Sequence, residues 1–61
     1  MRILIIEDDE IIATNIYEYL ESKGHIVDVA VDGKKGLYLA ATESFDIILL
    51  DLGLPNMDGL L

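Results

Sequence analysis

Two long apolar runs dominate the pattern of hydrophobic and polar positions along the chain. Residues 3–6 are all Ile or Leu, and residues 47–50 repeat that composition after Phe45 and Asp46. Continuous β-branched and Leu-rich runs of this length are typical of strands that are buried on both faces of a parallel sheet. We therefore predict strands at about residues 2–6 and 45–50.

Between these runs the hydrophobic pattern indicates a helix and then a further strand. Apolar residues recur at helical spacing, and acids and an Asn take the other side; the apolar positions are Ile12, Ile16, Tyr19 and Leu20. We expect this helix to end near Lys23, because Gly24 suits the left-handed position just past a helix end. Residues 25–31 are rich in Val and Ile and predict a second strand.

A second helix is expected over residues 34–41, with Leu37, Ala40 and Ala41 facing the core. Asp32 and Gly33 suit the turn and the N-cap that precede it. Residues 51–59 hold two glycines, a proline and short polar residues, which predicts a loop. A third helix would begin at residues 59–61, capped by Asp58.

The order β-α-β-α-β predicts the α/β class, with an incomplete doubly wound parallel sheet joined by right-handed crossovers. An apolar strand at the outside of such a sheet exposes unpaired backbone groups and invites pairing with another chain. If the strand at 45–50 lies there, we expect a homodimer, an exchange of this strand between chains, or aggregation.

Composition narrows the function classes. A chain of 61 residues with 52% apolar residues is too hydrophobic for a disordered segment, and it has no cysteine for disulfides or thiolate metal sites. Its net charge of -8 opposes direct contact with nucleic acid or anionic membranes and favours divalent cations or basic partners. It has no apolar stretch of ~20 residues and no secretory signal, so we expect a soluble cytoplasmic chain.

Acids follow both apolar runs, at residues 7–10 and at Asp51. In open parallel sheets ligands bind outside the carboxyl ends of the strands. If the two strands are neighbours, ~4.8 Å apart, two ionised carboxylates there repel by roughly 3 kcal/mol. A hard divalent cation such as Mg²⁺ would relieve this repulsion and make phosphoryl transfer to Asp51 plausible, with the Gly53 carbonyl approaching the metal and Pro55 stiffening the loop.

Each acid also has an ordinary structural explanation. Asp8 or Asp9 alone is more often the N-cap of the following helix than a metal ligand, and Asp51 alone could simply begin a turn. His25 is expected to be an ordinary residue at the start of a strand. Only the two acidic groups together support the prediction of a metal-binding site.

As a pair they resemble the first and third strand ends of a bacterial response-regulator receiver domain. The resemblance covers the chain in register and is carried by Arg2-Ile3-Leu4-Ile5-Ile6-Glu7-Asp8-Asp9 and by Ile48-Leu49-Leu50-Asp51-Leu52-Gly53-Leu54-Pro55-Asn56-Met57-Asp58-Gly59. It implies a flavodoxin-like strand order of 2-1-3, which makes the first and third strands neighbours. Residues 1–61 would be the N-terminal half of such a domain, truncated before strands 4 and 5.

The resemblance also implies roles for individual residues. Asp51 would be phosphorylated by a sensor histidine kinase; Asp8, Asp51 and the Gly53 carbonyl would bind Mg²⁺, and Glu7 would act through a metal-bound water. Glu7 with the Leu-Pro-x-Met-Asp-Gly loop is similar to transcription regulators that carry a winged-helix DNA-binding domain after the receiver. The Ser or Thr and the Lys that complete a receiver site fall beyond residue 61, so we expect weak Mg²⁺ binding, poor phosphorylation and no switching in this chain alone.

Two other function classes compete with this phosphoacceptor. Some metal-dependent phosphatases also use an Asp after a buried strand, in a motif that resembles Asp-x-Asp-x-Thr. This chain has Leu52 and Gly53 after Asp51, so the second acid of that motif is missing. We therefore expect no turnover enzyme. The remaining alternative is a structural half-domain that homodimerises or exchanges strands without phosphorylation-dependent switching.

Overall fold

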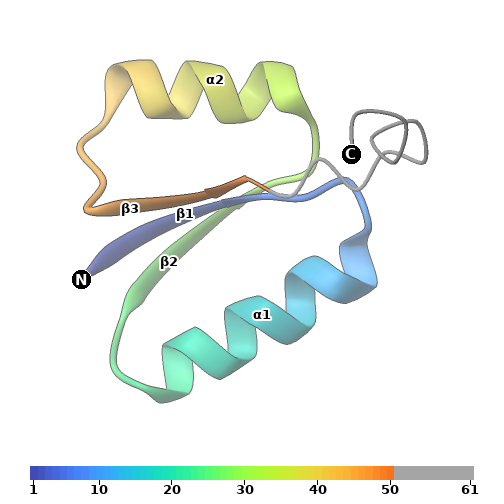
Figure 1. Cartoon of the computed structure of the whole chain (residues 1–61), viewed down its shortest axis with the longest axis vertical. Coiled ribbons are helices and arrows are strands. Elements are labelled where there is room, and N and C mark those ends of the chain that lie inside the picture. The colour runs from blue at the N-terminus through green and yellow to red at the C-terminus, as the bar shows by residue number, and fades with distance from the viewer. Residues whose placement is uncertain (51–61) are drawn as a thin grey trace, which may run out of the picture.

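The three strands lie in one parallel sheet, with α1 on one face and α2 on the other (Figure 1). The computed structural model describes residues 1–50, which form β1 (Arg2–Ile6), α1 (Glu10–Ser22), β2 (Ile26–Ala30), α2 (Gly33–Thr42) and β3 (Ile47–Leu50). The strand order is β2-β1-β3, so the first and third strands are neighbours. The predicted α/β class and the order 2-1-3 are confirmed, while the loop expected at 51–59 and the helix expected from 59 lie outside the described residues.

The element boundaries agree with the sequence pattern to within one or two residues. β1 has the bounds that were predicted, and α1 ends at Ser22 with Lys23 as its C-cap and Gly24 at a φ of 91°. β3 begins later than predicted, because Asp46 is used at the amino end of the sheet. Its carboxylate accepts a hydrogen bond from the Arg2 amide at 2.7 Å, and its own amide donates to the Arg2 carbonyl at 2.8 Å.

The core is centred on β1. Residues 3–6 are between 0% and 9% exposed, and Leu4 and Ile6 pack with Ala30 against residues of α2 and against Phe45. Two-faced burial is therefore confirmed for the first apolar run. It is wrong for the second run, where the exposed fractions of residues 47–50 range from 38% to 59%. Both helices pack mainly against β1 and β2, and β3 is an edge strand of the sheet that residues 1–50 form.

The buried face of α2 differs from the predicted one. Gly36 is buried against Ile6, whereas Leu37 is 71% exposed and Ala41 is also exposed. Successive helical residues are rotated by about 100°, so the residues that share the face of Gly36 are those three and four positions further on. These are Leu39 and Ala40, which pack on the core. The predicted burial of Leu37 and Ala41 was therefore wrong, and that of Ala40 is confirmed in part.

A similar rotation separates the expected and observed faces of α1. Ala13 is buried at 2% exposure, and Ile16, Tyr17 and Leu20 are half-buried at the following helical positions. The expected core positions Ile16 and Leu20 are thus confirmed in part, whereas Ile12 and Tyr19, which were also expected to face the core, are 43% and 62% exposed. A small Ala gives a weaker hydrophobic signal than Ile, although it allows the helix to lie close to the sheet.

Arg2 joins the amino ends of the elements. Its guanidinium forms ion pairs with Asp28 of β2, at 3.1 Å, and with Glu43 after α2, and it lies 4.7 Å from the centroid of the Phe45 ring. The hydrogen bonds to Glu43 and then to Asp28 raise the pKa of Arg2 above its ordinary value. None of the helices within residues 1–50 is long and apolar enough to cross a membrane.

Candidate functional site at the carboxyl edge of the sheet

The carboxyl ends of β1 and β3 coincide. Ile6 is the ladder partner of Leu50, the last residue of β3, and also of Ala30, the last residue of β2. The next residue after Ile6 in the chain is Glu7, whose amide donates to the Ala30 carbonyl at 3.0 Å. This bond extends the β1–β2 pairing by one residue and fixes the backbone where the acids begin.

Glu7 is a buried acid, with only 2% of its surface exposed. Burial of a carboxylate is costly unless hydrogen bonds compensate for the lost hydration. Its Oε2 accepts a hydrogen bond from the Asp9 amide at 2.9 Å. Glu7 therefore holds the connection between β1 and α1 in shape.

Asp9 is the N-cap of α1. It has an extended backbone, and its Oδ1 accepts hydrogen bonds from the amides of Ile11 at 2.9 Å and Ile12 at 3.2 Å. These bonds satisfy two of the amides that a helix leaves unpaired at its start. The N-cap interpretation is thus confirmed for Asp9, whose carboxylate is occupied by the helix.

Asp8 differs from both of its neighbours. Its side chain is exposed, and it makes no hydrogen bond or ion pair with the residues that the structure describes. The first three acids of the run thus have three different environments: Glu7 is buried, Asp9 caps a helix, and the carboxylate of Asp8 is open to solvent and to a cation.

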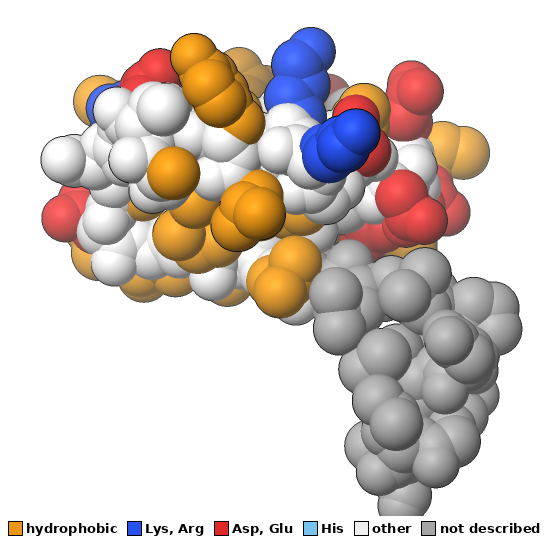
Figure 2. Space-filling model, turned by 90° about the horizontal axis from the view of Figure 1, so that it is seen from above, with side chains coloured by type: hydrophobic (Ala, Val, Ile, Leu, Met, Phe, Trp, Pro, Cys, Tyr) orange, Lys and Arg blue, Asp and Glu red, His pale blue; other side chains and the backbone are white. Residues whose placement is uncertain are grey.

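α2 begins at the same edge of the sheet. Asp32 is its N-cap and accepts a hydrogen bond from the Lys35 amide at 2.7 Å. Lys34 and Lys35 are exposed, and their side chains pair with no acid within residues 1–50. Figure 2 shows acidic side chains gathered at this end of the molecule. The carboxyl edge is therefore rich in carboxylates, and the charge of Arg2 is held at the opposite edge.

The predicted site is described only in part. Glu7 and Asp8 lie at the carboxyl edge, whereas Asp51, Gly53 and Pro55 lie outside the described residues. Within residues 1–50, no three acidic or histidine side chains form a group that would hold a metal ion by themselves. His25 lies at the amino edge, with its Nδ1 3.2 Å from the terminal amine.

Sequence reasoning missed the structural use of Glu7. The sequence pattern predicts only an acid beside a metal at this position, whereas in the structure the Glu7 carboxylate accepts a hydrogen bond from the amide of the N-cap residue. The available signal was its position two residues before the helix cap and directly after a buried strand.

The fold and this edge define a class: an α/β domain with strand order 2-1-3 and a group of carboxylates beyond its central strand. Residues 3–61 match the family described as the response regulator receiver domain. The chain therefore belongs to the response regulator receiver domain family.

Several curated proteins are similar to almost the whole chain. It is 48% identical over 59 residues to response regulator ArlR of Staphylococcus saprophyticus, covering 97% of this chain and 27% of ArlR. It is 45% identical over 60 residues to transcriptional regulatory protein DltR of Streptococcus agalactiae, covering 98% of this chain and 27% of DltR. Transcriptional regulatory protein HprR of Escherichia coli is 41% identical over 59 residues, covering 97% of this chain and 26% of HprR. The chain thus spans about a quarter of the length of these relatives.

Proposed function

We propose that Asp51 accepts a phosphoryl group from a sensor histidine kinase in a reaction that depends on Mg²⁺. The observation that carries this proposal is the parallel pairing of β1 and β3, with Ile6 opposite Leu50. Glu7 and Asp8 follow the first of these residues in the chain, and Asp51 follows the second. Ligands of open parallel sheets bind at such carboxyl ends, and membership of the receiver family supports the same assignment.

The described acids suit a hard divalent cation. The Asp8 carboxylate is exposed and unused by the residues that the structure describes, whereas the Asp9 carboxylate is occupied as a helix cap. Mg²⁺ prefers oxygen ligands and commonly keeps several waters. We assign Asp8, Asp51 and the Gly53 carbonyl as its direct ligands, and Glu7 as a residue that acts through a metal-bound water.

In this reaction an oxygen of the Asp51 carboxylate attacks the phosphorus atom, the bond to the donor breaks, and an acyl phosphate forms. When bound, Mg²⁺ neutralises charge on the phosphoryl oxygens. Glu7 contributes by holding the Asp9 amide, which orders the short connection that carries Asp8. Asp51 is consumed as an acceptor, so the chain acts as a signalling module and not as a turnover enzyme.

Residues 1–61 are, in this proposal, the N-terminal half of a receiver domain in a cytoplasmic regulator. Phosphorylation would control a DNA-binding effector, of the winged-helix class, elsewhere in the same protein. The names of DltR and HprR, both transcriptional regulatory proteins, support a role in transcription. The net charge of -8 makes contact between this chain and DNA itself unfavourable.

The test is phosphorylation by acetyl phosphate with and without Mg²⁺, followed by intact-protein mass spectrometry. We expect slow labelling of the chain that requires Mg²⁺, is lost in Asp51→Asn and is reduced in Asp8→Asn. Asp9→Asn is the matched control, because Asn also caps helices well, and it should label like the wild type. Equal labelling of Asp51→Asn and wild type would refute the proposal. Labelling as fast as that of a complete receiver would refute the expected need for the Ser or Thr and the Lys.

A second candidate function is self-association through β3. All four residues of this edge strand are at least 38% exposed, and exposed apolar edges favour pairing with another chain. Sedimentation at several concentrations should show association of the 61-residue chain that Leu49→Lys weakens. A monomer at every concentration would exclude this candidate and leave the phosphoacceptor proposal untouched.

A further inference from the structure

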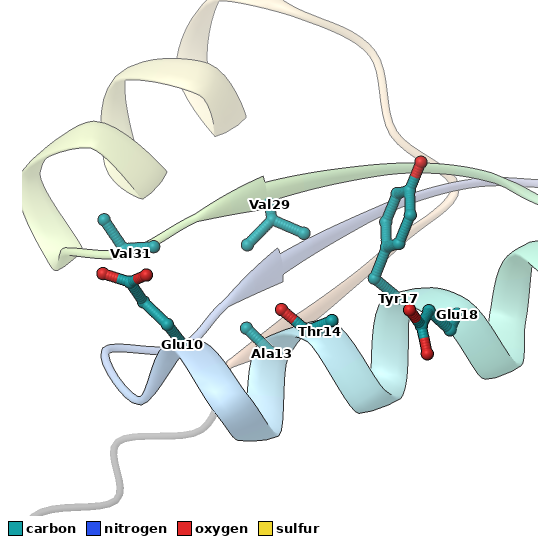
Figure 3. A pocket seen from close by; sticks show the side chains of 7 residues that line it. All are labelled: Glu10, Ala13, Thr14, Tyr17, Glu18, Val29 and Val31. Atoms are coloured by element: carbon teal, nitrogen blue, oxygen red, sulfur yellow. The ribbon is translucent and has the colours of Figure 1, made fainter.

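A groove between α1 and β2 is lined by residues that the proposed phosphoacceptor site does not use. Its volume is about 380 Å³, and Figure 3 shows the side chains around it: Glu10, Ala13, Thr14, Tyr17 and Glu18 from α1, and Val29 and Val31 from β2. Ala13 is buried, while Val31 is 44% exposed. The middle of the groove is thus apolar and accessible from solvent.

One wall of the groove is held in place by a hydrogen bond. The Tyr17 hydroxyl donates to the Glu21 carboxylate at 2.7 Å, one helical turn further along α1. This bond holds the hydroxyl end of Tyr17, one of the residues that line the groove. A side chain that is already hydrogen-bonded loses less freedom when a ligand binds, which lowers the entropy cost of binding.

The charge around the groove has one sign. Glu10 and Glu18 are the charged residues that line it, and α1 contains Glu21 as a third acid and no Lys or Arg. Eight residues along a helix correspond to about 12 Å, so the two carboxylates lie roughly two turns apart along the groove. An apolar centre with a carboxylate toward each end is complementary to an apolar side chain flanked by two cations.

We propose that this groove binds a cationic amphipathic helix of a partner protein. The helix would insert one aliphatic side chain against Ala13 and Val29 and place a Lys or Arg near each of Glu10 and Glu18. A helix presents residues at positions i, i+3 or i+4, and i+7 on one face, which matches this spacing of cation, apolar group and cation. A second copy of the chain is a poorer occupant, because each copy has a net charge of -8.

The probe is a fluorescein-labelled, Ala-based helical peptide with two Lys seven residues apart and a Leu between them on the same face. Binding to the full chain is measured by fluorescence anisotropy at low salt. Glu18→Gln should weaken binding about twofold to fivefold, the range for one exposed ion pair. Asn15→Lys is the matched control, since it changes the net charge by the same amount from an exposed position of α1 outside the groove lining.

A steric variant tests the groove itself. Thr14→Tyr adds a ring at an exposed groove position and should weaken binding more than tenfold, whereas Asn15→Tyr should leave it unchanged. Far-UV circular dichroism confirms that each variant retains the helical signal of the wild type. Amide shifts on peptide binding should centre on Ala13, Tyr17 and Val29.

Three results would overturn the proposal. Equal weakening by Glu18→Gln and Asn15→Lys would show that only the net charge matters. Shifts centred on β3 would place the peptide on the uncovered sheet edge instead. Self-association of the chain that Thr14→Tyr abolishes would make a second copy the occupant.

Discussion

β1 and β3 have almost the same composition and opposite environments. Their ladder partners Leu4 and Ile48 are 0% and 45% exposed, and Ile5 and Leu49 are 1% and 38% exposed. β1 lies between two strands and has a helix packed on each of its faces. Among the described elements β3 has one neighbouring strand, and the two helices pack mainly on β1 and β2. The burial of an apolar strand is therefore set by its position in the sheet, and its sequence alone is insufficient to predict it.

The same two strands share one functional property despite this difference. Each is followed in the chain by an acid, and their last residues, Ile6 and Leu50, are partners in the ladder. Parallel pairing fixes this coincidence whether or not a side chain is buried. The stability of the fold therefore depends on which strand is buried. The proposed site depends instead on the register between the two strands.

The largest expected effect is the difference in unfolding free energy between Leu4→Ala and Ile48→Ala. Leu4→Ala should cost about 2–5 kcal/mol of unfolding free energy, the range for a buried Leu, and should unfold much of so small a chain. Ile48→Ala should cost about 1 kcal/mol, because roughly half of its side chain is already in water. Urea denaturation of both variants measures the difference, and equal losses would contradict the contrast between the strands.

The packing of α2 on β1 predicts the next largest effect. A Cβ atom built at Gly36 would lie 2.5 Å from Cδ1 and 2.6 Å from Cγ1 of the Ile6 side chain. Gly36→Ala should therefore destabilise the fold by about 1–3 kcal/mol through overpacking. Gly33→Ala is the control, since nothing lies within 4 Å of its Cβ position, and it should be neutral or slightly stabilising. Thermal melts that rank Gly33→Ala below Gly36→Ala would contradict this packing.

Adjacent acids at the end of β1 should differ in their effect on stability. Asp9→Ala removes the N-cap of α1 and should cost about 1 kcal/mol. Asp8→Ala should change stability by less than about 0.5 kcal/mol, because Asp8 is exposed and has no partner among the described residues. Chemical denaturation without Mg²⁺ compares the two, and a larger loss for Asp8→Ala would reverse their assignments.

The smallest expected effect is a loss, at alkaline pH, of the stability that the Tyr17–Glu21 hydrogen bond contributes. The hydrogen bond to Glu21 raises the pKa of Tyr17 above its ordinary value. The stability that this bond contributes is present below the unfolded pKa of about 10 and is lost as the pH rises through the higher folded pKa. The stability difference between wild type and Tyr17→Phe should therefore shrink at high pH, as followed by denaturation at successive pH values. A difference that grows with pH would contradict this assignment.

Much of the fold could be predicted from the sequence, because the apolar runs, Gly24 and the capping acids each have a strong local signal. The helix faces were less predictable. α1 and α2 bury small residues, Ala13 and Gly36, against the sheet, and a hydrophobicity pattern gives little weight to either. The exposure of β3 could not be read from its residues, because it depends on what lies beside the strand.

For the candidate site, the positions of the acids could be predicted from the sequence, but the separate role of each acid could not. Glu7, Asp8 and Asp9 are chemically alike, and only the backbone path distinguishes the buried acid, the open acid and the cap. The sequence predicts that Asp8 or Asp9 caps α1 and does not choose between them, since both precede the helical pattern. The roles of Asp51 and Gly53 stay predictions, made from the family resemblance and the strand register.

A double-mutant cycle on Mg²⁺ binding tests most directly whether the ends of β1 and β3 form one site. Mg²⁺ is titrated into wild type, Asp8→Asn, Asp51→Asn and the double variant, and amide shifts report binding. We predict that each single change weakens binding and that the double change weakens it by much less than the sum, because both residues serve the same ion. Independent, additive losses, or unchanged binding in either single variant, would contradict the account.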